Sequence, residues 1–243
     1  MIALTLEELA RVLDGELVLP EGVSAETVVS GSVETDSRRV TDGSIFFALP
    51  GEQTDGHLFA PAAVDNGAAL VVSREDLGLA VPQLVVADGY AALAALAHEV
   101  VERVRSHGRL KVIGITGSNG KTTTKNLLRA ILEAEGPTVA PQGSFNNHVG
   151  APITMLRIDE HTRYLVAEMG AGAPGDIARL VRIARPDVAV VLKVGLAHAG
   201  EFGGIEATEA AKSEMVTELL PDDVAVLNVD DERVARMAGR TAA

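Results

Sequence analysis

The chain contains a glycine-rich run that ends in residue types suited to binding phosphate. Residues 114–124 read G-I-T-G-S-N-G-K-T-T-T. Backbone N–H groups of such a loop close around phosphate, and the N-terminus of a following helix adds a favourable dipole. Lys121 can then reach the β- and γ-phosphates of a nucleotide, while the Thr122 hydroxyl can hold Mg²⁺. The alternative is a glycine-rich turn that binds no ligand.

One position departs from the general form of this loop. The general pattern has a glycine five positions before Gly120, where this chain has Ile115. The nearby glycines are Gly114 and Gly117. The sequence therefore predicts a variant phosphate loop, whose nucleotide-binding residues are Gly117, Ser118, Asn119, Gly120, Lys121, Thr122 and Thr123.

Two further polar residues follow apolar runs that are typical of buried strands. Glu168 ends the run Y-L-V-A-E, and His198 lies in a glycine-rich segment just after the next predicted strand. Because ligands bind at the carboxyl ends of parallel strands, we expect both residues at the edge that holds the phosphate loop. A carboxylate there can hold Mg²⁺. The alternatives are a half-buried glutamate that caps the next helix and a loop histidine without a ligand.

Residue type alone leaves three other candidates open. Lys212 lies in a predicted helix, where it can pair with Thr208 or Glu209 on a solvated face. Asn146 and Asn147 can hydrogen-bond a polar substrate, but asparagines also form ordinary turns.

The beginning of the chain contains its own candidate site. Residues 35–39 read T-D-S-R-R and precede a short apolar run. Ser37 and Arg38 can bind a diphosphate through a hydroxyl and a guanidinium group. A solvated turn explains the same residues equally well.

The elements that must position these residues alternate regularly after residue 109. Strands alternating with helices predict a parallel sheet that is covered on both faces. The predicted strands are 112–116, 138–140, 164–167, 188–194 and 224–229. The predicted helices are 121–135, where residues 127, 128, 131 and 132 share an apolar face, then 175–184, 207–220 and one that starts at Asp231.

The earlier residues predict a separate, smaller α/β unit. Helices are expected at 5–13, with Thr5 as the N-cap, and at 60–66, and strands at 45–49, 69–72 and 84–86. A long alanine-rich helix at 90–105 leads into the second unit. We therefore predict an α/β chain with one domain at 1–84 and another at 85–243.

Composition limits the classes of partner and location. The 243 residues carry a formal charge of −13, so nucleic acid is not an expected partner, because a phosphate backbone requires clustered Lys and Arg. The chain has no cysteine, which excludes disulfides and thiolate chemistry. No run approaches the length of an apolar membrane span, so we expect no membrane insertion and a cytoplasmic location.

Several motifs together resemble a known family. The loop T-G-S-N-G-K-T-T at 116–123 resembles the nucleotide loop of the Mur ligases, the ATP-dependent amide-forming enzymes of peptidoglycan precursor synthesis. The departure at Ile115 is also the family's own. Motifs between residues 35 and 57 resemble the UDP-sugar-binding N-terminal domain of its later-acting members. The run N-N-H-V-G-A-P at 146–152 is similar to the signature of members that add D-alanyl-D-alanine.

This resemblance implies a fold and a role for each candidate. A small N-terminal UDP-sugar-binding domain would precede a parallel-sheet P-loop ATPase domain. Glu168 would bind Mg²⁺, His198 would lie near a second Mg²⁺, and Asn228 would lie near the adenine. Lys212 would be carbamylated, which turns an ammonium group into an oxygen-bearing anion that a hard cation accepts.

The implied activity is ATP-dependent addition of D-alanyl-D-alanine to UDP-N-acetylmuramoyl-tripeptide through an acyl phosphate. The chain is expected to end within the central domain and to lack the family's C-terminal domain, so no turnover is expected from it alone; the full-length enzyme is expected to be a monomer. A ligase with another amino acid donor and a non-catalytic nucleotide- or UDP-sugar-binding module are the alternatives. The implied catalytic residues are Lys121, Lys212 and His198, the metal-binding residues are Thr122, Glu168, His198 and Lys212, and the substrate-binding residues are Ser37, Arg38, Asn146 and Asn147.

Overall fold

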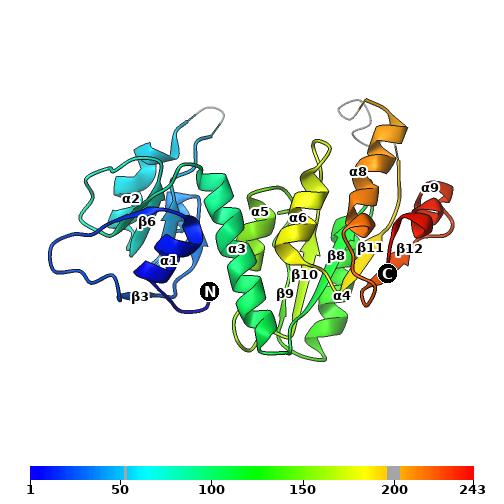
Figure 1. The fold of residues 1–243 in the computed structure, drawn as a ribbon, viewed down its shortest axis with the longest axis horizontal. Coiled ribbons are helices and arrows are strands. Elements are labelled where there is room, and N and C mark those ends of the chain that lie inside the picture. The colour runs from blue at the N-terminus through cyan, green and yellow to red at the C-terminus, as the bar shows by residue number, and fades with distance from the viewer. Residues whose placement is uncertain (52–53, 196–202) are drawn as a thin grey trace. The chain divides into compact units, whose positions relative to one another are not determined.

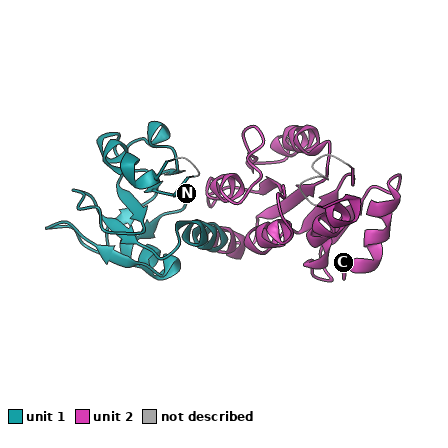
Figure 2. Cartoon of the chain, turned by 90° about the horizontal axis from the view of Figure 1, so that it is seen from above, with its two compact units in different colours: residues 1–100 teal, residues 101–243 magenta. Residues whose placement is uncertain are grey.

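The structure is a computed structural model that describes residues 1–51, 54–195 and 203–243. The chain divides into two compact units, residues 1–100 and 101–243 (Figure 2). The division falls within one long helix, α3 (Gly89–Ser106). The domain boundary that the sequence predicts, after residue 84, stays a prediction. Each unit is described below by itself.

Unit 1 combines short strands with short helices (Figure 1). Before α3 its elements are β1 (Leu4–Thr5), α1 (Leu6–Leu13), β2 (Glu16–Val18), β3 (Val28–Val29), β4 (Val33–Glu34), the 3₁₀ helix η1 (Ser37–Arg39), β5 (Ile45–Phe47), the 3₁₀ helix η2 (Gly56–Phe59), α2 (Ala60–Asp65), β6 (Leu70–Ser73) and β7 (Gln83–Val85).

The start of α1 shows how local sequence sets a helix boundary. The Thr5 hydroxyl accepts a hydrogen bond from the Glu8 N–H at 3.1 Å, and the Glu8 carboxylate accepts one from the Thr5 N–H at 2.9 Å. This reciprocal capping box satisfies two N–H groups that the helix leaves free. Leu6, Leu9 and Leu13 are buried on one face. The predicted helix and its N-cap are confirmed.

A mixed sheet forms the centre of unit 1. Among the described residues its strand order is β2-β7-β6-β5-β4; β2 and β7 are antiparallel, and the other neighbours are parallel. Phe46 of β5 and Val71 of β6 pack against Ala60 and Ala63 of α2 in one buried cluster. The small alanine side chains let the helix approach the sheet closely.

Unit 2 alternates strands and helices after α3. Its elements are β8 (Lys111–Thr116), α4 (Lys121–Glu133), β9 (Thr138–Val139), α5 (Gly150–Met155), β10 (Tyr164–Glu168), α6 (Asp176–Ala184), β11 (Val188–Val191), α8 (Ile205–Thr217), β12 (Val224–Leu227), α9 (Glu232–Ala235) and the 3₁₀ helix η3 (Arg236–Arg240).

The sheet of unit 2 is parallel throughout the described strands. Its order is β12-β11-β8-β10-β9. The prediction of a parallel sheet is therefore confirmed. Because β8 lies between β10 and β11, the residues that follow these three strands gather at one edge, and the phosphate loop lies in the middle of it.

Alternate residues of β8 face different helices, and helices lie on both faces of the sheet (Figure 2). Ile113 and Ile115 share a buried cluster with Leu128 and Leu132 of α4. On the other face, a Cβ at Gly114 would lie 3.3 Å from the Met215 sulfur of α8, so glycine lets this helix pack closely.

Only part of the predicted apolar face of α4 packs against other elements. Leu128 and Leu132 pack on the sheet, but Leu127 and Ile131 are 61% and 63% exposed. The sequence predicts that these four residues share an apolar face, and the structure covers only two of them. Helical periodicity shows which side chains share a side of the helix, whereas the width of the covered stripe depends on the neighbouring elements.

The structure also contains a short helix that begins within the asparagine-containing run at 146–152. Helix α5 begins there at Gly150, because the Asn147 side-chain oxygen accepts hydrogen bonds from the N–H groups of Val149 and Gly150 at 3.2 and 2.8 Å. Strand β11 is also shorter than predicted and ends at Val191.

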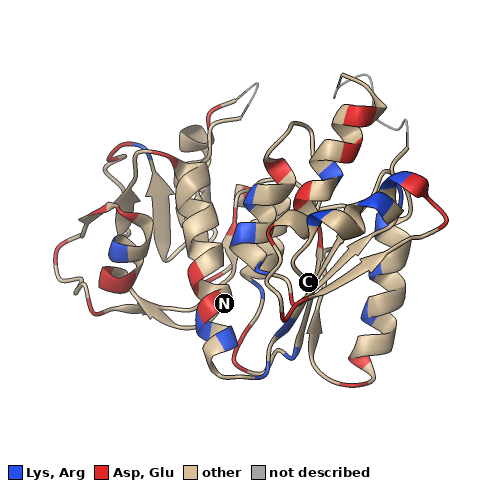
Figure 3. Cartoon of the chain, turned by 45° about the vertical axis from the view of Figure 1, so that its right-hand side comes forward, with Lys and Arg blue, Asp and Glu red and all other residues tan. Residues whose placement is uncertain are grey.

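Acidic and basic residues are interspersed along the helices of unit 2 (Figure 3). Arg182 of α6, for example, makes two hydrogen bonds to Glu218, at 3.1 and 2.8 Å. Among the described residues, no helix has the length and apolar character needed to cross a membrane.

Candidate functional site

The phosphate loop depends on two glycines. Gly117 and Gly120 have φ values of 155° and 86°, in the region that disfavours side chains, and Gly120 is the N-cap of α4. A Cβ on Gly117 would also lie 3.0 Å from the Cβ of Leu192. The loop therefore adopts a shape that other residues would strain, and it exposes the first N–H groups of α4.

Lys121 lies at the first position of α4 and is folded back over the loop. Its Nζ donates a hydrogen bond to the Gly117 carbonyl at 2.7 Å. Partial burial lowers the pKa of Lys121, and the negative charge of Glu168 partly opposes this effect. The ammonium group is thus poised between the loop backbone and a nearby carboxylate.

Glu168 connects three segments of the chain. It ends β10, is 1% exposed, and accepts a hydrogen bond from the Thr122 hydroxyl at 3.1 Å. Its other oxygen accepts one from the Asn146 side-chain amide at 2.7 Å. The structure therefore brings three of the predicted site residues into direct contact.

The paired asparagines have different roles in the structure. Asn146 reaches Glu168, whereas the Asn147 side-chain oxygen accepts hydrogen bonds from the backbone at the start of α5. The interpretation as a turn describes the Asn147 side chain, whereas Asn146 contacts Glu168; the predicted substrate-binding role of both asparagines stays a prediction. Both residues also line the pocket described next.

A pocket of about 500 Å³ opens beside the phosphate loop. It lies within unit 2, at the edge where the residues after β8 and β10 gather. Its lining includes Gly117, Lys121, Asn146, Gly170, Asp176 and Lys212.

Lys212 faces this pocket from α8 and is only 6% exposed. Burial, with a smaller contribution from the charge of Lys121, lowers its pKa to about 8. Glu209, the partner expected on a solvated helix face, instead binds Arg236 and Arg240 at 2.8 and 3.4 Å. Among the described residues no hydrogen bond or ion pair engages the Lys212 ammonium group.

The donor groups beside the phosphate loop suit a hard cation only in part. The Thr122 hydroxyl and the Glu168 carboxylate are oxygen donors of the kind that Mg²⁺ prefers. Across the described ranges, however, no group of three His, Asp or Glu residues could hold a metal ion alone. The remaining ligands would have to come from nucleotide, water or a modified Lys212. His198 lies outside the described residues.

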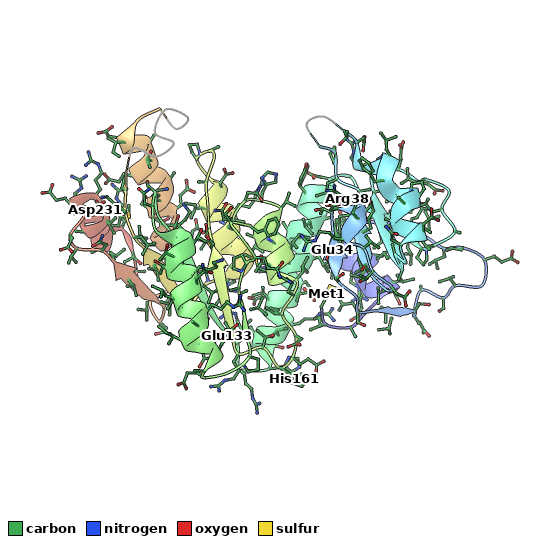
Figure 4. All side chains as sticks on the ribbon, turned by 180° about the vertical axis from the view of Figure 1, so that it is seen from behind. Met1, Glu34, Arg38, Glu133, His161 and Asp231 are labelled. Atoms are coloured by element: carbon green, nitrogen blue, oxygen red, sulfur yellow. The ribbon has the colours of Figure 1, made fainter. Side chains whose placement is uncertain are left out.

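Two predicted nucleotide-binding residues make structural hydrogen bonds. The Ser118 hydroxyl accepts a hydrogen bond from the Gly195 N–H at 2.9 Å. Asn228, at the end of β12, donates from its side-chain amide to the Leu192 carbonyl at 2.8 Å. Asp231 lies in the same region (Figure 4) and accepts a hydrogen bond from the Val194 N–H at 3.0 Å. The described residues after β11, 192–195, therefore hydrogen-bond to the phosphate loop on one side and to the residues after β12 on the other. Asn228 does not line the pocket.

Ser37 and Arg38 belong to unit 1. Ser37 is buried, while the Arg38 side chain, labelled in Figure 4, is 87% exposed. The Arg38 guanidinium makes hydrogen bonds of 2.9 and 2.7 Å to Asp36, and these contacts hold the pKa of that carboxyl below its usual range. The guanidinium is accessible, but an anionic ligand would have to compete with Asp36 for it.

Sequence reasoning missed three residues that shape the site. Asp176 lines the pocket and accepts hydrogen bonds from the N–H groups of Gly172 and Ala173, at 2.9 and 2.8 Å. Glu214 caps α6, and Lys125 is buried in α4. Lysine is scarce in this sequence, which could have drawn attention to Lys125. No pattern in the neighbouring residues could have identified Glu214.

The comparisons with known proteins agree with this geometry. Residues 115–243 match the Mur ligase middle domain, and residues 31–113 match the catalytic domain described for the Mur ligase family. The UDP-N-acetylmuramoyl-tripeptide–D-alanyl-D-alanine ligase of Mycobacterium leprae is 44% identical over 266 residues, which cover 100% of this chain and 51% of the relative. The chain thus spans about half the length of the curated relatives it matches.

Solved structures show the same relationship. A crystal structure of MurF from Acinetobacter baumannii has a TM-score of 0.88 and 35% identity, and the match covers 99% of this chain and 52% of that one. The MurF ligase of Thermotoga maritima in complex with ADP has a TM-score of 0.78 and 33% identity, over 87% of this chain and 49% of that one. With more than half of its residues matched by the middle domain, and with a phosphate loop, Glu168 and Lys212 gathered at one sheet edge, this chain belongs to the Mur ligase family.

Proposed function

We propose that this chain takes part in the ATP-dependent addition of D-alanyl-D-alanine to UDP-N-acetylmuramoyl-tripeptide. The observation that carries the proposal is a pocket of about 500 Å³ lined by Lys121, Asn146 and Lys212. Beside it, Glu168 accepts hydrogen bonds from Asn146 and from the Thr122 hydroxyl. The names of the relatives and the ADP complex of a similar protein support the choice of nucleotide and substrates.

The reaction needs an activated carboxylate, because oxide is a poor leaving group. The γ-phosphoryl group of ATP would pass to a carboxylate oxygen of the tripeptide, which gives an acyl phosphate and ADP. The amine of D-alanyl-D-alanine would then attack the carbonyl carbon; inorganic phosphate leaves, and the nitrogen loses a proton. Two anions meet in the first step, so nearby cations stabilise its transition state most. Lys121 lies where it can serve this purpose.

Thr122 and Glu168 would hold one Mg²⁺, whose chemistry here is neutralisation of phosphate charge. The second predicted site would use Lys212 and His198. For this role the neutral Lys212 amine would add to CO₂ and release one proton, so that a carbamate forms. Its pKa of about 8 leaves more of the neutral amine at physiological pH than an ordinary lysine has. A carbamate signal in ¹³C NMR after addition of labelled bicarbonate, lost in Lys212→Arg, would support this step; its absence in the unaltered chain would contradict it.

Unit 1 would bind the UDP part of the substrate through Ser37 and Arg38, and Asn228 would lie near the adenine. We further propose a cytoplasmic, monomeric enzyme, in line with the expectations from composition and from the family.

The test has two parts because the relatives are about twice as long as this chain. Calorimetric titration with Mg·ATP measures binding at the nucleotide site. Lys121→Ala is the comparison variant and should bind Mg·ATP more weakly. Phosphate release is then measured with UDP-N-acetylmuramoyl-tripeptide, with and without D-alanyl-D-alanine. Release that depends on the dipeptide supports the ligase. Release with a different amino acid donor favours another ligase. Binding without release is expected of this chain alone, so the same release assay on a full-length relative with its Lys121 counterpart intact separates the ligase from the non-catalytic module. A chain that does not bind Mg·ATP contradicts the proposal.

A further inference from the structure

Lys125 is a buried lysine that the proposed reaction does not use. It lies in α4, one turn after Lys121, and is 3% exposed. Burial of an ammonium group is unfavourable unless hydrogen bonds compensate for the lost water. The Lys125 Nζ donates to the carbonyls of Pro141 and Gly143, at 3.0 and 3.1 Å. Within the described part of the chain no carboxylate forms an ion pair with it, so these carbonyls are its partners.

The two carbonyls belong to the segment that ends at Asn146, the residue that contacts Glu168. This segment runs from Pro141 to Asn146 between β9 and α5. At its far end the Asn146 carbonyl accepts a hydrogen bond from the Gly170 N–H at 2.8 Å, and the Asn146 side chain donates to Glu168 at 2.7 Å. The segment is thus held by Lys125 where it begins and by the residues that end β10 where it finishes.

Helix α4 contacts both Glu168 and the segment from Pro141 to Asn146. Thr122 and Lys125 are three positions apart and therefore lie on the same side of the helix. Thr122 contacts Glu168, while Lys125 holds the segment that carries the other partner of Glu168. Packing leaves little room for movement, since a Cβ at Gly170 would lie 2.7 Å from the Asn146 side-chain oxygen.

We propose that Lys125 is a positioning residue, which holds the segment from Pro141 to Asn146 so that the Asn146 amide meets Glu168. The role of this contact in catalysis rests on the proposed function. The positioning itself is a property of the chain that can be measured without ATP or substrate.

The test is amide hydrogen exchange, followed by NMR, in Lys125→Met. This change removes both donors and keeps the length of the side chain. We expect the Gly170 amide to exchange at least about tenfold faster, because the variant loses two hydrogen bonds donated by a charged group. The Ala178 amide of α6, which donates to Glu214 at 3.0 Å, is the reference for a part of unit 2 that Lys125 does not contact. Positioning predicts that the exchange of Gly170 rises relative to that of Ala178.

Arg129→Met is the matched control, since Arg129 lies on the exposed side of α4 and pairs with Glu133. It should leave the ratio of the two exchange rates unchanged. If Lys125→Met does not fold, Lys125→Ala is measured instead, because it also removes both donors and leaves room for water at the two carbonyls. A ratio within twofold of the unaltered chain in the variant that folds would overturn the proposal.

A chemical rescue separates loss of the ammonium group from loss of bulk. The chain has no cysteine, so Lys125→Cys carries a single thiol. Alkylation of the unfolded chain with 2-bromoethylamine, followed by refolding, restores an ammonium group at nearly the length of lysine. Alkylation with bromoethane restores the bulk alone. Only the first product should recover slow exchange at Gly170, and equal recovery by both would contradict the role of the charge. Failure of the ligase assay would not alter either result.

Discussion

Glu168→Gln should separate the structural role of this residue from its role toward a cation. The carboxylate accepts hydrogen bonds from Asn146 and Thr122. In the variant, the amide oxygen can accept from Asn146, and the amide N–H can donate to the Thr122 hydroxyl, which serves equally as an acceptor. We therefore expect the free energy of unfolding to stay within ~1 kcal/mol. Glu168→Ala instead leaves the Asn146 amide without a partner and should cost ~1–3 kcal/mol.

Binding of Mg·ATP should respond differently. The variant loses the negative charge that would hold the cation and that supports the charged form of Lys121. Loss of one preorganised charged group typically weakens such a site by ~10²-fold, or ~2.7 kcal/mol. Unaltered stability with much weaker Mg·ATP binding is thus the expected combination.

Thermal unfolding with and without Mg·ATP measures both effects. At a concentration of about 100 times Kd, ligand binding stabilises the folded chain by ~2.7 kcal/mol, which raises Tm by roughly 5–10 °C for a protein of this size. The same concentration should produce almost no rise in Glu168→Gln. Glu133→Gln, on the surface at the end of α4 (Figure 4), is the matched control and should behave like the unaltered chain. An equal rise in Glu168→Gln would refute the assignment of Glu168 to the cation.

Three other perturbations test the site and its support. Lys121→Ala should lower the rate of phosphate release in an active ligase by at least ~10²-fold, and a near-normal rate would exclude Lys121 from that step. Burial alone would raise the pKa of Asp187, but the N–H of Val112 and the charge of Lys111 help to hold it below its usual value. The stability that Asp187 contributes is therefore present above pH ~4 and is lost as the pH falls through the lowered pKa. In urea unfolding at neutral pH, Asp187→Asn should be ~1.5–3 kcal/mol less stable than the unaltered chain. Near pH ~3 this difference in stability should be smaller. Acylation of Lys212, followed by mass spectrometry, should be half-maximal near pH 8, whereas a midpoint above pH 10 would contradict its burial beside Lys121.

The parts of the site that are contiguous in sequence were predictable. The β8–loop–α4 unit follows from an apolar strand, glycines at the turn and helical spacing after Lys121, all of which are local preferences. The position of Glu168 at the same edge also follows, because parallel strands end on one side of their sheet. The contacts of Glu168 with Thr122 and Asn146 were not predictable, since they depend on strand order and on the path between β9 and α5.

The sequence by itself determined the α/β class and the phosphate loop, because backbone propensity, periodicity and spacing act over a few neighbouring residues. The roles of the other candidate residues came from the resemblance to the family. The tertiary structure decided which candidates meet. It buries Lys212 against the pocket and turns Glu209 toward arginines, although both lie in one helix turn. It also places Lys125 against carbonyls more than ten residues away in the chain. Burial and long-range contact arise only when separate elements pack together, so no local pattern specifies them.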